Sequence, residues 1–265
     1  MRHLDRKLTM EGNVTDTPRE TRVLEAVVSL VDTLLEDFDV VDLLTELTGR
    51  CAELLDVAAA GFLLADPFGQ LRLLAATSEQ ARELELFQLQ ADEGPCLDCY
   101  ASGQPVSIAD LRVAARRWPK FVPAALEGGF ASVHAVPMRA TGLVLGALGL
   151  FGNHPGELNG ADVLVGQTLA HIACVALLQE DAPNPSTVLP RLRAALAGRV
   201  VVEQAKGLLC EMLDVSVEDA FTLMRSYARA NGKHLIDVAR MLMADRHSRP
   251  ALVAQISEFT KRSTG

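Results

Sequence analysis

The spacing of apolar residues divides the chain into helical segments around a strand-rich middle. From Glu20 the apolar positions recur every three to four residues, and a second helical stretch follows over 40–55. The first stretch carries a broad apolar stripe made of Val23, Leu24, Val27, Val28, Leu30, Val31, Leu34 and Leu35. A stripe this wide exceeds what one small core needs, so we expect part of it to contact a second subunit.

Short apolar runs in the middle of the chain predict strands. Residues 58–65 and 71–77 flank Asp66-Pro67-Phe68-Gly69-Gln70, which predicts a hairpin. Residues 79–89 are short and irregular in pattern, and a helix is expected over 163–179. Further strands are expected over 105–109, 132–139 and 143–151. Helices around hairpin strands predict an α+β domain built on an antiparallel sheet flanked by helices.

A polar stretch with Pro183 and Pro185 ends this domain, and the pattern beyond it is wholly helical. One helix is expected over 189–213, and Ser216 with Asp219 forms a capping box for the next. That second helix is expected to bury Val217, Ala220, Phe221, Met224 and Ala228. A third helix, starting near Lys233, completes an all-α three-helix domain whose small core would gain from dimerisation.

Five segments follow from these patterns. They are a flexible leader over 1–19, an α+β domain over 20–180, a Pro-containing linker over 181–188, a three-helix domain over 189–248, and a C-terminal tail over 249–265.

Charge distinguishes the two domains. The net charge is −9 over 265 residues, but residues 1–185 hold 13 Lys/Arg and 26 Asp/Glu, whereas residues 186–265 hold 12 Lys/Arg and 8 Asp/Glu. A basic C-terminal domain can attract phosphate, even in a chain that is acidic as a whole.

Neither targeting nor membrane insertion is expected. The first twenty residues lack the apolar core of a secretory signal, and 141–152 and 163–179 are too short or too polar for a membrane span. Five scattered cysteines fit a reducing cytoplasm better than a disulfide framework. We therefore expect a cytoplasmic protein.

Residues 202–209, Val-Glu-Gln-Ala-Lys-Gly-Leu-Leu, resemble the signature of ANTAR domains, the RNA-binding output modules of bacterial antitermination regulators. The resemblance continues through Ala220-Phe221, Leu223, Arg225, Ala228, Asn231 and residues 233–239, Lys-His-Leu-Ile-Asp-Val-Ala. It implies binding to leader RNA, where paired hairpins are held so that a terminator cannot form. It also implies a homodimer.

The first domain resembles the GAF fold, a sensor of cyclic nucleotides and other small molecules. The resemblance is carried by residues 93–98 (Glu-Gly-Pro-Cys-Leu-Asp), 103–106 (Gly-Gln-Pro-Val), 118–119 (Trp-Pro), 136–138 (Val-Pro-Met) and 145–150 (Leu-Gly-Ala-Leu-Gly-Leu). No cofactor is evident from the residues. The fold implies a pocket for an unidentified small-molecule effector, or an empty pocket.

Candidate RNA contacts lie in the second domain. Arg225 and Arg229 are one helical turn apart on a face away from the expected core, where a guanidinium can pair with phosphate and stack on bases. Their spacing alone favours a solvated face at the negative end of the helix, and the ANTAR resemblance favours RNA. The predicted RNA-binding residues are Lys206, Arg225, Arg229, Asn231, Lys233 and His234.

Cys96 and Cys99 form a CxxC motif that fits a redox pair, half of a zinc site, or two loop thiols. The chain has no second CxxC and its six histidines lack ligand spacing, so no metal site is predicted. There is no phosphate-binding P-loop and no GxSxG motif, so no catalytic residues are predicted.

The leading hypothesis is therefore a regulator that is not an enzyme: a GAF sensor domain gates an ANTAR domain that binds leader RNA and promotes transcription antitermination. One alternative is a GAF-type redox enzyme or sensor that uses Cys96 and Cys99, since some GAF proteins reduce free methionine sulfoxide. That alternative leaves residues 186–265 unexplained. The other alternative is a protein-interaction module for an acidic partner or the ribosome.

Overall fold

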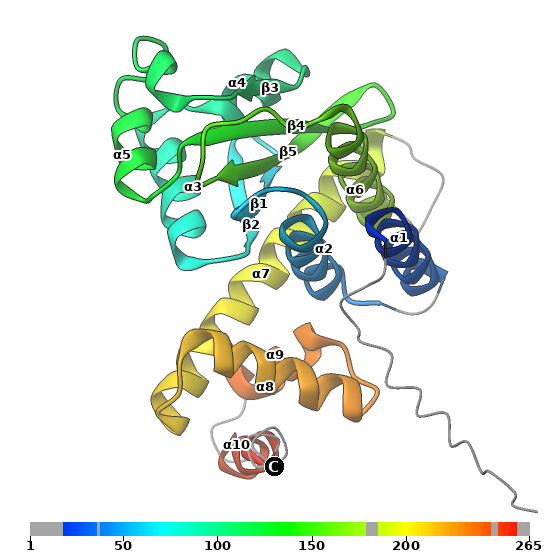
Figure 1. Cartoon of the computed structure of the whole chain (residues 1–265). Coiled ribbons are helices and arrows are strands. Elements are labelled where there is room, and N and C mark those ends of the chain that lie inside the picture. The colour runs from blue at the N-terminus through cyan, green and yellow to red at the C-terminus, as the bar shows by residue number, and fades with distance from the viewer. Residues whose placement is uncertain (1–17, 36–37, 179–184, 245–248, 259–265) are drawn as a thin grey trace, which may run out of the picture.

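An antiparallel sheet lies between two groups of helices, and a wholly helical part follows it in the chain (Figure 1). The structure, a computed structural model, describes residues 18–35, 38–178, 185–244 and 249–258. Its helices are α1 (Arg19–Leu35), α2 (Val40–Leu54), α3 (Glu79–Ala91), α4 (Pro95–Ser102), α5 (Phe121–Glu127), α6 (Gly160–Leu178), α7 (Pro185–Leu213), α8 (Val217–Ala230), α9 (Leu235–Ala244) and α10 (Arg249–Ser257), with a 3-10 turn over Leu111–Ala114. Its strands are β1 (Ala59–Ala65), β2 (Leu71–Ala76), β3 (Val106–Ile108), β4 (Ser132–Ala140) and β5 (Leu143–Gly152).

The strands run in the order β2-β1-β5-β4-β3, and every neighbouring pair is antiparallel. The β1–β2 hairpin forms where its turn residues predict it. Asp66 holds that turn, because its Oδ1 accepts hydrogen bonds from the backbone N–H groups of Phe68 (2.9 Å) and Gln70 (3.0 Å). The predicted α+β fold with an antiparallel sheet is confirmed.

Each face of the sheet has its own core. Helices α1, α2 and α6 cover one face, where Leu44 and Leu47 of α2 pack against strand residues such as Leu148. Helices α3, α4 and α5 cover the other face, which is filled around Trp118 and Phe121. We call this body, α1 to α6 with the sheet, the sheet domain.

Helix α6 corrects one expectation from the sequence. Among the described residues it is the one helix long and apolar enough to cross a membrane. The expectation that this segment is too short or too polar for a membrane span is therefore not met. Half of its most apolar window is nevertheless buried within the protein, and Leu169, Ala170 and Ala173 are fully enclosed in the core. In this structure α6 serves as a core helix of the sheet domain.

Helix α3 corrects another, because residues 79–89 do not form an irregular segment. Ser78 caps α3, with its Oγ accepting a hydrogen bond from the Ala81 N–H at 3.2 Å. The buried positions are Ala81, Leu84, Glu85 and Gln88, which have helical spacing. Two of these four are polar, so the apolar pattern alone did not reveal the helix.

The C-terminal helices α7 to α10 form a third core, which includes Val202, Leu209, Met224, Leu242 and Ile256. Helix α7 begins at Pro185, within the predicted linker, and α10 occupies the first part of the predicted tail. Residues 1–17, 179–184 and 259–265 lie outside the described residues, and on them fall most of the predicted leader, half of the predicted linker and the rest of the predicted tail.

Two of the positions in α8 that were predicted to be buried are not. Val217 is 50% exposed and Phe221 is half-buried, whereas Leu223 and Tyr227 are buried. The buried face of α8 is therefore rotated away from the first residue of the helix. Ser216 does cap α8 as predicted, with its Oγ accepting from the Asp219 N–H at 3.0 Å.

The two parts meet along α7, whose Leu192 and Ala195 belong to the core that α1, α2 and α6 form with the sheet, and at the N-terminal end of α2. Val41 of α2 belongs to the core of the C-terminal helices rather than to that of the sheet domain. Gly198 of α7 allows this close approach, since a Cβ there would lie 2.6 Å from Ile236 Cδ1 and 3.4 Å from Val41 Cγ2. The contact places the start of α2 beside α8 and the turn that follows it.

Candidate nucleic-acid interface

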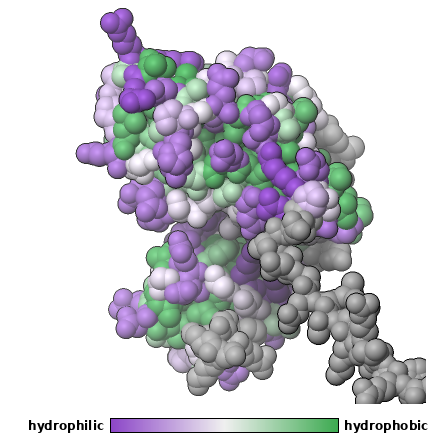
Figure 2. Space-filling view, viewed as in Figure 1, coloured by the Kyte–Doolittle hydropathy of each residue, from purple (hydrophilic) through white to green (hydrophobic). Residues whose placement is uncertain are grey.

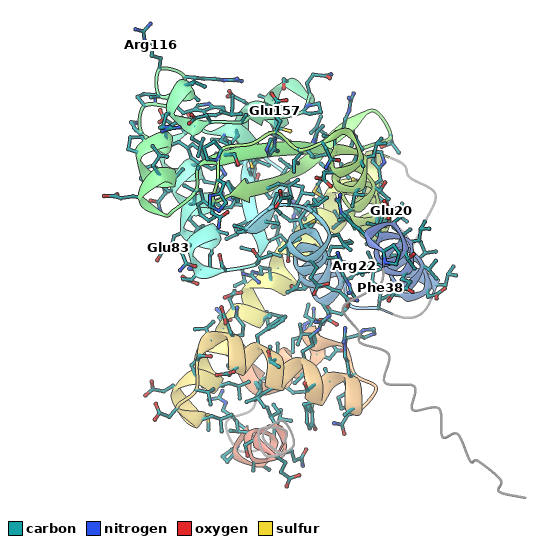
Figure 3. The ribbon with its side chains drawn as sticks, in the orientation of Figure 1. Glu20, Arg22, Phe38, Glu83, Arg116 and Glu157 are labelled. Carbon is teal, nitrogen blue, oxygen red and sulfur yellow. The ribbon has the colours of Figure 1, made fainter. Side chains whose placement is uncertain are left out.

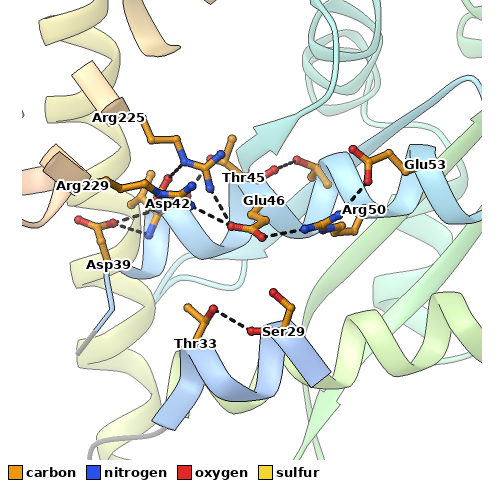
Figure 4. Close-up of polar contacts among 12 residues, drawn as sticks. Ser29, Thr33, Asp39, Asp42, Thr45, Glu46, Arg50, Glu53, Arg225 and Arg229 are labelled. Atoms are coloured by element: carbon orange, nitrogen blue, oxygen red, sulfur yellow. Dashed lines mark hydrogen bonds and ion pairs between the residues drawn. The ribbon is translucent and has the colours of Figure 1, made fainter. Parts of the chain in front are cut away.

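Helix α8 carries the two arginines predicted to bind RNA. Its buried face consists of Ala220, Leu223, Met224, Tyr227 and Ala228, which fixes the rotation of the helix on the third core. Arg225 and Arg229 consequently lie together on the neighbouring face, as their spacing predicts. That face is turned toward α2 of the sheet domain (Figure 4).

Both arginines are paired with carboxylates of α2. Arg225 Nε contacts Asp42 Oδ1, and its Nη2 donates to Glu46 Oε2 at 2.8 Å. Arg229 Nη2 lies 3.0 Å from Glu46 Oε2 and 3.5 Å from Asp42 Oδ2. Two guanidinium groups thus face two carboxylates, which we call the α2 carboxylate pair (Asp42 and Glu46).

Burial differs across these four groups. The side chains of Asp42 and Glu46 are each 19% exposed and that of Arg225 is 24% exposed, whereas that of Arg229 is 58% exposed. Burial raises the pKa of Asp42 above its ordinary value, while the charges of Arg225 and Arg229 oppose that rise. The two ion pairs of Arg225 are therefore more shielded from solvent and salt than those of Arg229.

Asp39 connects the start of α2 to the segment after α8 through side-chain hydrogen bonds. Its Oδ1 caps α2 by accepting from the N–H groups of Val41 (2.8 Å) and Asp42 (3.0 Å). Its Oδ2 accepts from the backbone N–H of Ile236 at 2.8 Å. One aspartate thereby joins the start of α2 to the start of α9.

Three other predicted RNA contacts lie at this turn. Asn231 ends α8, and its Nδ2 donates to the Tyr227 carbonyl at 2.8 Å. Lys233 is exposed, and its backbone N–H donates to the Ala228 carbonyl at 2.9 Å. His234 is half-buried, and its carbonyl accepts from the N–H groups of Asp237 and Val238.

Lys206 lies apart from this group. It projects from α7, with its Nζ 2.9 Å from Glu203 Oε1 and 5.5 Å from the centre of the Phe221 ring. The structure thus brings Arg225 and Arg229 together, places Asn231, Lys233 and His234 at the next turn, and puts Lys206 in a separate cleft.

Sequence reasoning missed the acidic partners. Asp39, Asp42 and Glu46 recur at helical spacing, which marks one acidic stripe on the expected second helix. The spacing gives no indication of what the stripe faces, because the arginines that pair with Glu46 lie 179 and 183 residues further along the chain.

The two CxxC cysteines are buried on α4 and unbridged. Burial raises the pKa of Cys99 to about 12 and that of Cys96 well above the usual range, and the nearby Glu85 reinforces the rise at Cys96. Both thiols are thereby held protonated, and the thiolate is the reactive form. The described residues contain no group of three His, Cys, Asp or Glu side chains that would hold a metal ion.

Glu85 is a buried carboxyl that sequence reasoning did not single out. Gly61 and Gly149 make room for it, since a Cβ on Gly149 would lie 2.5 Å from Glu85 Oε1 and one on Gly61 2.7 Å from it. Gln88 donates a hydrogen bond to Glu85, and the Cys96 N–H donates to Gln88 Oε1 at 3.1 Å. Burial raises the pKa of Glu85 to about 8, against the hydrogen bonds from Gln88 and Cys96.

Family comparisons agree with this architecture. The model of the GAF domain matches residues 39–177, and that of the ANTAR domain matches residues 191–243. None of the curated proteins compared matches the chain.

Solved structures give fold-level likenesses. The GAF domain of a phosphoenolpyruvate-protein phosphotransferase from Coxiella burnetii is 16% identical, with a TM-score of 0.49 over 60% of this chain and 94% of that one. The free methionine-R-sulfoxide reductase from Neisseria meningitidis is 18% identical, with a TM-score of 0.47 over 69% of this chain and 97% of that one. Likenesses at this level carry no conclusion about ligand or activity.

Proposed function

We propose that this chain, which belongs to the GAF domain family and carries a C-terminal ANTAR domain, binds leader RNA hairpins through α8 and the α8–α9 turn. In this proposal binding promotes transcription antitermination, and the GAF domain gates it. The described arrangement is the closed state, in which the α2 carboxylate pair covers Arg225 and Arg229.

The observation that carries the proposal is the pairing of Arg225 and Arg229 with Asp42 and Glu46. Guanidinium groups pair with carboxylate and phosphate in the same forked geometry, so the α2 carboxylate pair occupies the place that RNA phosphates would take. RNA and α2 then compete for one surface.

This competition gives the gate a simple thermodynamic form. RNA binds only the open fraction of the protein, so its apparent affinity falls by that fraction. A closed state favoured by about 2.7 kcal/mol lowers the apparent affinity roughly 100-fold. A signal that separates α2 from α8 restores it, provided that the signal binds the open state better than the closed state.

We also propose that the protein works as a homodimer. Helix α1 exposes part of the apolar stripe anticipated from the sequence, with Leu24 66%, Val28 58% and Leu35 79% exposed. Burying this stripe against a second copy would be favourable, and a dimer would present two ANTAR domains to two hairpins.

In this proposal the protein is a cytoplasmic regulator without catalytic activity. The five cysteines are free, which suits a reducing compartment. The protonated, buried thiols of Cys96 and Cys99 give no support to the reductase alternative.

The test is binding of a dual-hairpin leader RNA across a salt series, with Arg225→Gln/Lys233→Gln compared with Arg116→Gln/Arg240→Gln. Arg116 projects from the far end of the GAF domain (Figure 3), and Arg240 is an exposed residue of α9. We expect salt-sensitive, loop-dependent binding that the first variant weakens about tenfold or more and the control retains. Equal affinity for the hairpins and for scrambled RNA would contradict the proposal.

A further inference from the structure

A cleft of about 630 Å³ lies between the GAF domain and the ANTAR helices, lined by α2, the start of α3, α7 and the start of α8. Figure 2 shows the surface narrowing at the junction of the two parts. The first turns of α8, around Val217 and Phe221, line the cleft, whereas Arg225 and Arg229 belong to the following turns. Its volume is that of a small-molecule site.

Three cations converge on this cleft. Arg199 and Lys206 project from α7 with side chains only 12% exposed, and they share one carboxylate oxygen, Glu203 Oε1, at 2.6 and 2.9 Å. Arg82 lines the cleft from the GAF side. Two enclosed positive charges therefore have a single carboxylate between them.

Burial and a like charge both act on Arg199. Burial lowers the pKa of Arg199 below its ordinary value; Glu203 opposes that fall, and the like charge of Arg82 adds to it. An enclosed excess of positive charge is costly unless an anion compensates it.

Two helix N-termini also open into the cleft. Helix α3 starts beside Ser78 and helix α8 starts beside Ser216, and both serines line the cleft. The N-terminal end of a helix carries partial positive charge and favours anions. The first-turn residues Glu79 and Glu218 line the cleft too, but both are exposed, and Glu79 pairs with Arg82 at 2.8 Å.

One wall of the cleft is apolar. Phe221 lines it, and Lys206 Nζ lies 5.5 Å from the centre of the Phe221 ring. Ala52 of α2 and Ala76 of β2 face the same space from the GAF side. The cleft therefore offers a cationic region together with a surface for a flat or apolar group.

We propose that this cleft binds a small phosphorylated molecule of nucleotide size, with its phosphate among Arg82, Arg199 and Lys206 and its ring against Phe221. The walls come from both domains, so the ligand binds the closed state and holds α2 against α8. Because the closed state hides Arg225 and Arg229, the ligand decreases RNA affinity. That consequence rests on the function proposed above, whereas binding in the cleft does not depend on it.

The test is isothermal titration of the full-length protein with adenosine 5′-monophosphate, alongside adenosine and inorganic phosphate. We expect the monophosphate to bind, and adenosine to bind about tenfold more weakly or not at all. Arg82→Gln should weaken monophosphate binding about tenfold with an unchanged melting temperature, since the Arg82 side chain is 39% exposed. Arg199→Gln should abolish it, and Arg116→Gln should leave it unchanged.

Several results would overturn the inference. The cleft is not a phosphate site if none of the three probes binds at about 5 mM, or if Arg82→Gln and Arg199→Gln titrate like the wild type. If Lys206→Gln weakens RNA binding while no probe binds, the cleft belongs to the RNA surface instead. A protein that binds the monophosphate but no RNA refutes the proposed function and leaves the cleft site intact.

Discussion

Arg225 Nη2 and Glu46 Oε2 lie 2.8 Å apart although 179 positions separate the two residues in the chain. This contact joins α8, the helix predicted to bind RNA, to α2, the first helix of the GAF domain. Because Arg225 is largely enclosed and Arg229 is mostly exposed, the two arginines differ in what they contribute to the closed state.

The first prediction concerns this difference. Arg225→Gln leaves Asp42 buried without its closest cation, so we expect a loss of about 1–3 kcal/mol in the free energy of unfolding. Arg229→Gln should cost less than about 1 kcal/mol, because exposed ion pairs contribute little. Urea denaturation of the full chain measures both, and equal losses would show that burial does not distinguish the two pairs.

The second prediction is a pH dependence that originates at Glu85. Its pKa is about 8 in the folded protein and near 4.5 in the unfolded chain, so the folded state binds the extra proton between these values. The stability contributed by the protonated carboxyl is complete below pH 4.5 and is lost as the pH rises through about 8.

Glu85→Gln should remove that loss. At pH 9, about one unit above the folded pKa, the variant should be more stable than the wild type by a few kcal/mol. Glu83→Gln is the matched control, because Glu83 is exposed on the same helix (Figure 3). Parallel pH profiles of the melting temperature for the wild type and Glu85→Gln would show that Glu85 does not titrate in this range.

The third prediction concerns thiol reactivity. Cys210 is half-buried, whereas Cys96 and Cys99 are buried with raised pKa values. We expect iodoacetamide at pH 8 to modify Cys210 first and to reach Cys96 and Cys99 only after unfolding. Peptide mass spectrometry resolves the order, and early modification of Cys96 would revive a redox role for the pair.

The fourth prediction addresses the exposed stripe of α1. Val28→Glu places a charge in the stripe and should weaken self-association about tenfold or more. Gln90→Glu adds the same charge at an exposed position of α3, where it should have little effect. Light scattering over a concentration series decides, and identical masses for both variants and the wild type would place the dimer interface elsewhere.

Local patterns predicted much of the fold. The turn at Asp66 was predictable because its hydrogen bonds join residues two to four positions apart. Helix α3 was not, because Glu85 and Gln88 occupy buried positions where a core-facing pattern has apolar residues. The space left by Gly61 and Gly149 makes the burial of Glu85 possible, and that space is a property of the assembled sheet.

Local spacing predicted only part of the candidate site. The shared face of Arg225 and Arg229 follows from helical spacing alone. Their pairing with Asp42 and Glu46 depends on how the two domains meet, which no local pattern encodes.

The measurement that tests the account most directly is the affinity of the double variant Asp42→Asn/Glu46→Gln for a dual-hairpin leader RNA. Its matched control is Glu53→Gln/Glu83→Gln, which changes the net charge equally at exposed sites. The account predicts that removing the α2 carboxylate pair raises RNA affinity about tenfold or more over both the wild type and the control. An affinity equal to that of the control, or below that of the wild type, would contradict the claim that α2 covers the RNA-binding surface.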